Sequence, residues 1–142
     1  MAIETRSGIL LDTHIRVWLN MASSELTSKT VALIDEAGLR GEVFVHAITV
    51  WEIATLESKG RLTMKKPLDQ WITEALSKPG VSLVPLLPEI AIESARLPSV
   101  SHGNPADRIV VATARVMGLA LITRDAKILA YAKQGHVTAA RG

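Results

Sequence analysis

Residues 9–20 read ILLDTHIRVWLN, and this stretch decides the fold class. Ile9–Asp12 is a short apolar run that ends in a carboxylate, which is typical of a strand buried in a parallel sheet. The residues that follow place Ile15, Trp18 and Leu19 at helical spacing, so a helix is expected directly after the strand. A buried strand that runs straight into a helix predicts an α/β protein.

The same alternation continues along the rest of the chain. Further strands are expected at residues 42–45, 81–84 and 119–122, with 136–138 as the candidate for a last strand. Helices are expected at residues 13–20, 26–38, 48–59, 67–77, 88–96, 105–117 and 126–133. Strands that alternate with helices predict a three-layer α/β sandwich with a mainly parallel central sheet flanked by helices.

Length and composition limit the classes of protein that fit. The 142 residues are 48% apolar, which suits a single domain over residues 1–142 with a real core. No apolar run approaches the roughly 20 residues of a membrane span, and Met1–Gly8 lacks the apolar stretch of a secretory signal. Cysteine is absent, which excludes disulfides and thiolate metal sites and is consistent with the cytoplasm.

The net charge and the aromatic residues do not by themselves identify a binding partner. The formal net charge of +2 is too small to indicate nucleic-acid binding by itself. Trp18, Trp51 and Trp71 are three of only five aromatic residues, and we expect all three in the core. A protein that stacks RNA bases on its sheet usually has more aromatic residues. An RNA partner would therefore be bound through backbone charge and a metal.

Four carboxylates stand where a site could form. Asp12 ends the first strand and Asp125 lies just beyond residues 119–122, so both belong at the carboxyl edge of the sheet, where α/β proteins bind ligands. Asp107 lies in the first turn of its helix, and Glu52 lies in an otherwise apolar helical stretch. The aspartates are also good helix caps or partners of a helix dipole, but a buried glutamate needs a partner.

Carboxylates without cysteine indicate a hard divalent cation with oxygen ligands. Mg²⁺ fits best, because it keeps waters and binds through few carboxylates, and Mn²⁺ is a close substitute. An unneutralised cluster would repel itself and a phosphodiester alike. With a metal bound, the same cluster can activate water and stabilise the leaving oxygen of an in-line displacement.

Other motifs limit the kind of metal site and the class of enzyme that fit the sequence. The histidines show no zinc-binding spacing, and no GxSxG, Walker or GxGxxG motif occurs. Arg108 and Arg124 each adjoin a proposed ligand and are candidates for phosphate contacts. His102 lies in the loop before Asp107, where it fits a substrate contact or, equally well, a histidine that organises the loop. The basic residues Lys59, Arg61, Lys65 and Lys66 fit a solvated turn better than a phosphate track.

Together these segments resemble the PIN-domain toxins of VapBC toxin–antitoxin systems. The resemblance rests on four segments in order, which are Leu10–His14, Trp51–Ala54 with Lys59–Leu62, Pro105–Arg108 running into Ala112–Ala114, and Leu121–Asp125. It implies a ribonuclease that leaves a 5′-phosphate and a 3′-hydroxyl, with Asp12, Glu52, Asp107 and Asp125 binding Mg²⁺ or Mn²⁺. Thr123 is implied as a polar helper, and a cognate antitoxin and toxin dimers are implied as partners.

Two positions depart from this pattern. Asn104 stands where relatives often carry Asp, which lowers the local negative charge near the quartet Asp12, Glu52, Asp107 and Asp125. We keep Asn104 as a candidate supporting residue. His46 stands where a small residue such as Ser is common before the Glu52 helix.

Two other functions compete with this one. A phosphoaspartyl enzyme would use Asp12 as a nucleophile, but residues 13–16 supply no second acid beside it. A catalytically silent PIN-like module would bind RNA or a protein without cutting, and the intact quartet argues against it.

Overall fold

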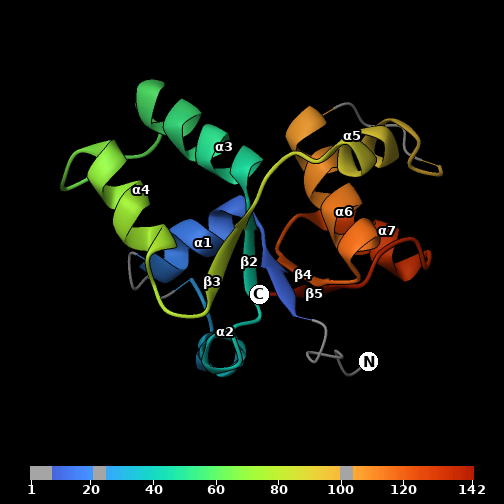
Figure 1. Cartoon of the computed structure of the whole chain (residues 1–142), viewed down its shortest axis with the longest axis horizontal. Coiled ribbons are helices and arrows are strands. Elements are labelled where there is room, and N and C mark those ends of the chain that lie inside the picture. The colour runs from blue at the N-terminus through green and yellow to red at the C-terminus, as the bar shows by residue number, and fades with distance from the viewer. Residues whose placement is uncertain (1–7, 21–24, 100–103) are drawn as a thin grey trace.

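The computed structural model describes residues 8–20, 25–99 and 104–142, which form a five-stranded sheet with seven helices (Figure 1). The elements are, in chain order, β1 (Ile9–Leu11), α1 (Thr13–Asn20), α2 (Ser28–Leu39), β2 (Val43–His46), α3 (Ala47–Ser58), α4 (Leu68–Leu76), β3 (Val81–Val84), α5 (Pro88–Ala95), α6 (Pro105–Met117), β4 (Ala120–Thr123), α7 (Ala126–Lys133) and β5 (Ala139–Arg141).

The sheet has the strand order β3-β2-β1-β4-β5, and every pair in it is parallel. The sequence therefore predicted the α/β class correctly, and the sheet is wholly rather than mainly parallel. β1 lies in the middle and its three residues are fully buried, as its continuous apolar run predicted. Since β1 and β4 are neighbours and run the same way, the residues after them meet at one edge.

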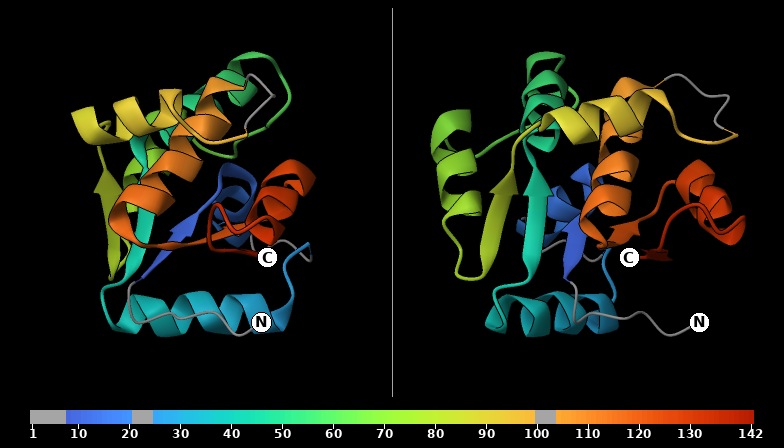
Figure 2. Two further views of the ribbon diagram at one scale, coloured as in Figure 1. Left: turned by 90° about the vertical axis from the view of Figure 1, so that its right-hand side faces the viewer. Right: turned by 45° about the vertical axis from the view of Figure 1, so that its right-hand side comes forward.

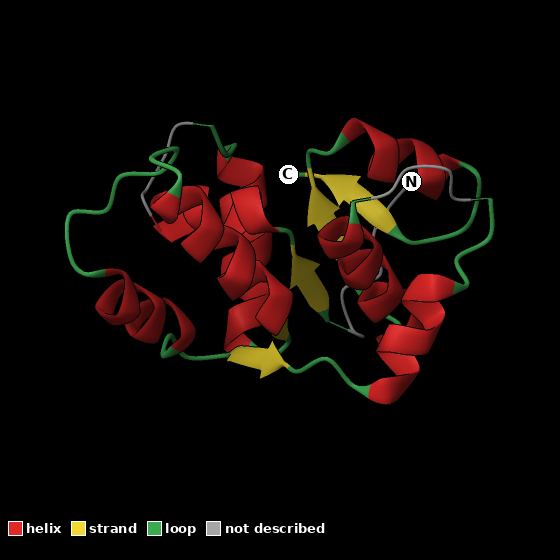
Figure 3. Cartoon of the chain, turned by 90° about the horizontal axis from the view of Figure 1, so that it is seen from above, coloured by secondary structure: helices red, strands yellow, loops and turns green. Residues whose placement is uncertain are grey.

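Helices cover both faces of the sheet. Ile9 and Leu11 of β1 pack with α1 and α2, whereas Leu10 packs with residues of α5, α6 and α7. In Figure 2, α2 lies on the side of the sheet away from α5 and α6. Seen from above, α4 and α7 lie at opposite ends of the molecule, with strands between them (Figure 3). Nearer the middle, α3 contacts α6. No helix in the described part of the chain has the length and apolarity needed to cross a membrane.

Two expectations from the sequence were wrong. The last strand is Ala139–Arg141 and not residues 136–138, because β4 pairs Leu121 with Ala139 and Thr123 with Arg141. Trp51 is 60% exposed and does not belong to the core, whereas Trp71 is buried as expected. The side chain of Trp18 lies outside the described part of the structure.

Candidate active site

The four predicted acids meet in one cavity of about 300 Å³. They come from the end of β1, from α3, from the first turn of α6 and from the residue before α7. The residues that line the cavity are Asp12, Thr13, His14, Glu52, Asn104, Asp107, Arg124 and Asp125. The cavity lies beyond the carboxyl ends of β1 and β4, where an open parallel sheet is expected to bind its ligand.

Asp12 is held by hydrogen bonds to both of its carboxylate oxygens. Oδ1 accepts from the backbone N–H of Thr13 at 2.8 Å, and Oδ2 accepts from the hydroxyl of Thr123 at 2.7 Å. The backbone N–H of Asp12 also donates to the carbonyl of Ile122 in β4 at 3.1 Å. The Asp12 carboxylate therefore has one orientation, fixed before any ligand arrives.

Thr123 links two members of the quartet. Its buried hydroxyl donates to Asp12 and accepts from the backbone N–H of Asp125 at 3.0 Å. A hydroxyl can make both bonds at once because it has one hydrogen and two lone pairs. The resemblance implied Thr123 as a polar helper, and its place in the structure is the junction between the ends of β1 and β4.

Glu52 reaches the cavity from α3, where Thr49 and Ile53 form the buried face. Its Oε1 accepts a 2.6 Å hydrogen bond from the hydroxyl of Thr13. Burial raises the pKa of Glu52, and the charge of Asp12 raises it further, while the Thr13 hydrogen bond and His14 lower it. Glu52 is thus a partly buried carboxylate with a defined partner.

Asp107 carries the clearest electrostatic sign of a clustered site. Burial, followed by the charges of Asp12, Asp125 and Glu52, raises the pKa of Asp107 to about 7 in total. Lys127 opposes the shift. The helix is capped by Asn104, whose side chain accepts from the backbone N–H of Ala106 at 3.0 Å. Asp107 therefore is not needed as the cap of α6.

Asp125 combines two roles. It is the N-cap of α7, and its Oδ1 accepts from the backbone N–H of Ile128 at 3.0 Å. It also lines the cavity and its charge acts on Asp107. The helix-cap interpretation of Asp125 is correct and does not compete with a role in the site.

The donor set fits a hard cation bound largely through water. Oxygen donors dominate the cavity, and the mutual repulsion at Asp107 is the cost that a bound cation would remove. Within residues 8–20, 25–99 and 104–142, no three acidic or histidine side chains lie close enough to enclose an ion directly. Mg²⁺ is usually held by one or two carboxylates and keeps several waters, so an open cluster suits it.

A family model for the PIN domain matches residues 9–134. The chain belongs to the PIN-domain family. It is 30% identical to ribonuclease VapC22 of Mycobacterium tuberculosis over 130 residues, which are 92% of this chain and 96% of that protein. The residues matched by the family model include every residue that lines the cavity.

Solved structures share the fold of this PIN domain. VapBC2 from Rickettsia felis, bound to a DNA fragment from its promoter, matches with a TM-score of 0.63 at 12% identity and covers 94% of this chain and 97% of that chain. FitAcB from Neisseria gonorrhoeae matches with a TM-score of 0.62 at 24% identity, and the match covers 92% of this chain and 95% of that chain.

The basic candidates are placed differently in this PIN domain. Arg124 lines the cavity, and its Nε donates to the carbonyl of Gly142 at 2.6 Å. Arg108 does not line the cavity, and its Nε donates to the carbonyl of Ser94 at the end of α5 at 2.9 Å. His102 lies outside the described residues.

Sequence reasoning missed Thr13 and His14 as lining residues. Both directly follow the carboxylate at the end of β1, and this position was the available signal. His46 is the N-cap of α3, and its Nδ1 accepts from the backbone N–H of Ile48 at 2.8 Å. His46 thereby does the work that a small capping residue such as Ser would do.

Proposed function

We propose that this PIN domain is a metal-dependent endoribonuclease that hydrolyses RNA phosphodiesters. The observation that carries the proposal is the convergence of Asp12, Glu52, Asp107 and Asp125 on one cavity. The kinship with a ribonuclease over nearly the whole chain supports the choice of RNA as substrate.

In this proposal the quartet binds Mg²⁺, or Mn²⁺ as a substitute, through one or two carboxylates directly and through bound waters for the rest. The cation, when bound, supplies an activated water and charge stabilisation for the leaving oxygen. Thr13 and Thr123 keep the carboxylates of Glu52 and Asp12 in place. Without the cation, the raised pKa of Asp107 lets its carboxyl hold a proton near neutral pH, which lowers the repulsion within the cluster.

Arg124 is the proposed RNA contact that the geometry supports best, because it lines the acidic cavity. Its guanidinium is partly engaged with Gly142 and with Glu25, where the Nη1 to Oε2 distance is 3.6 Å, so it is held in place beside the carboxylates. Arg108 and His102 remain proposed RNA contacts, and Asn104 remains a proposed supporting residue.

A cognate antitoxin is the proposed regulator, with a toxin homodimer inside a larger complex in the cytoplasm. VapBC2, a solved structure with this fold, is bound to DNA from its promoter, and another structure that resembles this chain is a toxin–antitoxin complex from Klebsiella pneumoniae. We take residues 1–142 as one domain in this assembly.

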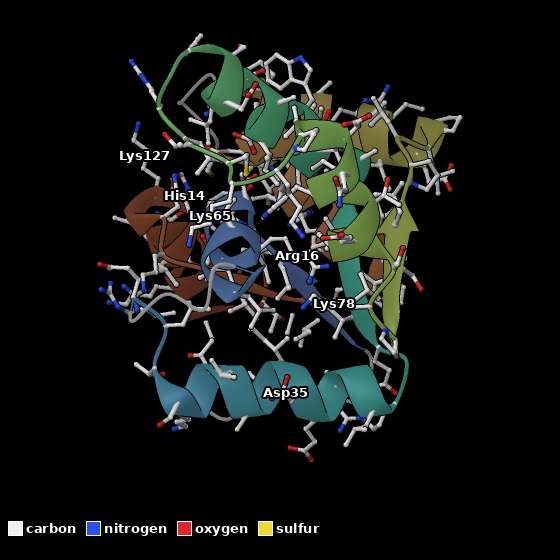
Figure 4. The ribbon with its side chains drawn as sticks, turned by 90° about the vertical axis from the view of Figure 1, so that its left-hand side faces the viewer. His14, Arg16, Asp35, Lys65, Lys78 and Lys127 are labelled. Carbon is white, nitrogen blue, oxygen red and sulfur yellow. The ribbon has the colours of Figure 1, made fainter. Side chains whose placement is uncertain are left out.

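RNA cleavage by the purified protein tests the proposal. We expect cleavage in the presence of Mg²⁺ or Mn²⁺ and no cleavage after a chelator is added. The cut RNA should carry 5′-phosphate ends. Asp12→Asn should reduce the rate by about 100-fold or more, since it removes a charge that holds the cation. Asp35→Asn is the matched control, because Asp35 lies on the exposed side of α2 (Figure 4). Equal rates with and without chelator would exclude the metal mechanism.

A further inference from the structure

A second cavity, of about 460 Å³, lies beside α4. Its lining residues come from α4, from the loop before it and from the residues after it, and they are Thr63, Lys65, Lys66, Trp71, Glu74, Ala75 and Lys78. It shares no lining residue with the acidic cavity. Figure 4 shows Lys65, Lys78 and Arg16 on the side of the molecule formed by α1 and α4. We call this second cavity the lysine cavity.

The lysine cavity has an excess of positive charge. Lys66 forms an ion pair with Glu74, so these two charges compensate each other. Lys65 and Lys78 are exposed, and neither has an acidic partner in the described part of the chain. Two lysines therefore face solvent at this cavity without a counter-charge.

A buried arginine adds to this charge. Arg16 on α1 is 2% exposed, and its terminal nitrogen donates to the carbonyl of Ala75, a residue that lines the lysine cavity. Its Nε has no hydrogen-bond partner within the residues that the structure describes, and burial lowers its pKa to about 10. A buried charge without an ionic partner is unfavourable, so an anion in the lysine cavity would lower this cost through its charge, without contacting Arg16 itself.

Helix α1 stands between the two cavities. His14 lines the acidic cavity, whereas Arg16 contacts a lining residue of the lysine cavity. Two residues apart on a helix of about 3.6 residues per turn, they point to opposite sides of α1. A helix with its side chains is about 10–12 Å wide, so we expect one short stretch of RNA to be long enough to contact both cavities.

We propose that the lysine cavity binds a backbone phosphate of the substrate RNA, a few nucleotides from the bond that is cut. This inference rests on the proposed ribonuclease function and adds a second contact to it. Lys65 and Lys78 supply mobile point charges for the phosphate, and Arg16 supplies a fixed charge behind them. The acidic cavity repels phosphate until a cation is bound, so a separate cationic site explains how RNA is retained.

The test compares Lys65→Ala/Lys78→Ala with wild type and with Lys133→Ala, a change at an exposed lysine in the last turn of α7. Binding of a short fluorescent RNA is measured by anisotropy in a chelator, so that no cutting occurs, over a series of salt concentrations. The double variant should bind several-fold more weakly and lose about 0.7 from the slope of log K against log salt, the contribution of one phosphate on a single strand. Its KM for RNA with Mg²⁺ present should rise by a similar factor.

Each other outcome has a definite meaning. If the double variant keeps the wild-type slope and KM, the lysine cavity does not bind RNA and the inference is wrong, while metal-dependent cleavage by wild type still supports the proposed function. If inorganic phosphate raises the Tm of wild type but RNA binding is unchanged in the double variant, the cavity serves a free anion. If only antitoxin binding weakens, it serves a protein partner. Failure of wild type to cut RNA would instead refute the proposed function.

Discussion

The hydroxyl of Thr13 donates a 2.6 Å hydrogen bond to Oε1 of Glu52, across 39 positions of sequence. The backbone N–H of the same residue donates to Oδ1 of Asp12 at 2.8 Å. Thr13 therefore touches two of the four acids, one through its side chain and one through its backbone. A carboxylate on α3 is thereby held in a fixed position relative to the end of β1.

Thr13→Val should disturb the site while keeping the fold, because valine has nearly the same shape and lacks only the hydroxyl. A hydrogen bond to a charged group contributes about 1.5–3 kcal/mol, so metal affinity and kcat should fall by roughly 10- to 100-fold. Mn²⁺ binding by calorimetry and RNA cleavage measure the two effects. Thr13→Ser restores the hydroxyl and should recover both. A valine variant with wild-type Mn²⁺ affinity would show that Thr13 has no part in placing Glu52.

Asp107→Asn should stabilise the metal-free protein at alkaline pH and abolish cleavage. The pKa of Asp107 is raised from 3.8 to about 7 in the folded state, so the folded protein binds the proton more tightly than the unfolded chain does. Stability from this group is therefore full below pH 3.8 and is lost as the pH rises through about 7. Asparagine removes the ionised form, so urea unfolding at pH 8 should show a higher midpoint.

The Asp107→Asn variant also distinguishes the two interpretations of Asp107, as a member of the acidic site or as a partner of the helix dipole. Asn104 already caps α6 through the N–H of Ala106, so loss of the Asp107 charge should not loosen the helix end. If Asp107→Asn cleaves RNA normally and unfolds at a lower urea concentration, the aspartate serves the helix dipole and not the site. Glu36→Gln, at an exposed acid on α2, is the matched control.

The positions of the acids could be predicted because strand ends and helix starts are local features. Asp12 follows a fully apolar run and Asp125 follows Leu121–Thr123, so parallel pairing of β1 with β4 brings them together. The contact of Thr13 with Glu52 could not be predicted, since it depends on how α3 packs against α1. The spacing of residues within either segment does not indicate such a contact.

The two errors have physical causes as well. β5 has the sequence Ala139-Ala140-Arg141, which lacks the apolar alternation of a strand, and it forms because β4 offers a free edge for pairing. α3 is apolar nearly all round, so periodicity does not reveal its buried face. Packing selects Thr49 and Ile53 for that face and leaves Trp51 exposed.

Acid should destabilise the protein through His46. Burial lowers the pKa of His46 below its ordinary 6.5, and the Pro85 carbonyl opposes this only in part. The neutral ring is required because Nδ1 accepts from the N–H of Ile48. The stability is therefore present above pH 6.5 and is lost as the pH falls through the lowered pKa. His46→Ser keeps a capping oxygen, and its urea midpoint should show a weaker loss between pH 7 and 5 than that of wild type.

Antitoxin should inhibit cleavage directly by occupying the acidic cavity. A basic side chain of the antitoxin is expected to pair with the carboxylates of Asp12, Asp107 and Asp125, which would otherwise hold the cation. Charge pairs in a desolvated interface can couple by about 1.5–7 kcal/mol, enough to compete with a weakly held ion. The cleavage rate is measured against antitoxin concentration at a fixed toxin concentration. Excess Mg²⁺ should restore only part of the cleavage rate. Asp107→Asn should weaken antitoxin binding, whereas Asp35→Asn should leave it unchanged. A complex that forms and still cuts RNA at the rate of free toxin would place the antitoxin away from the quartet.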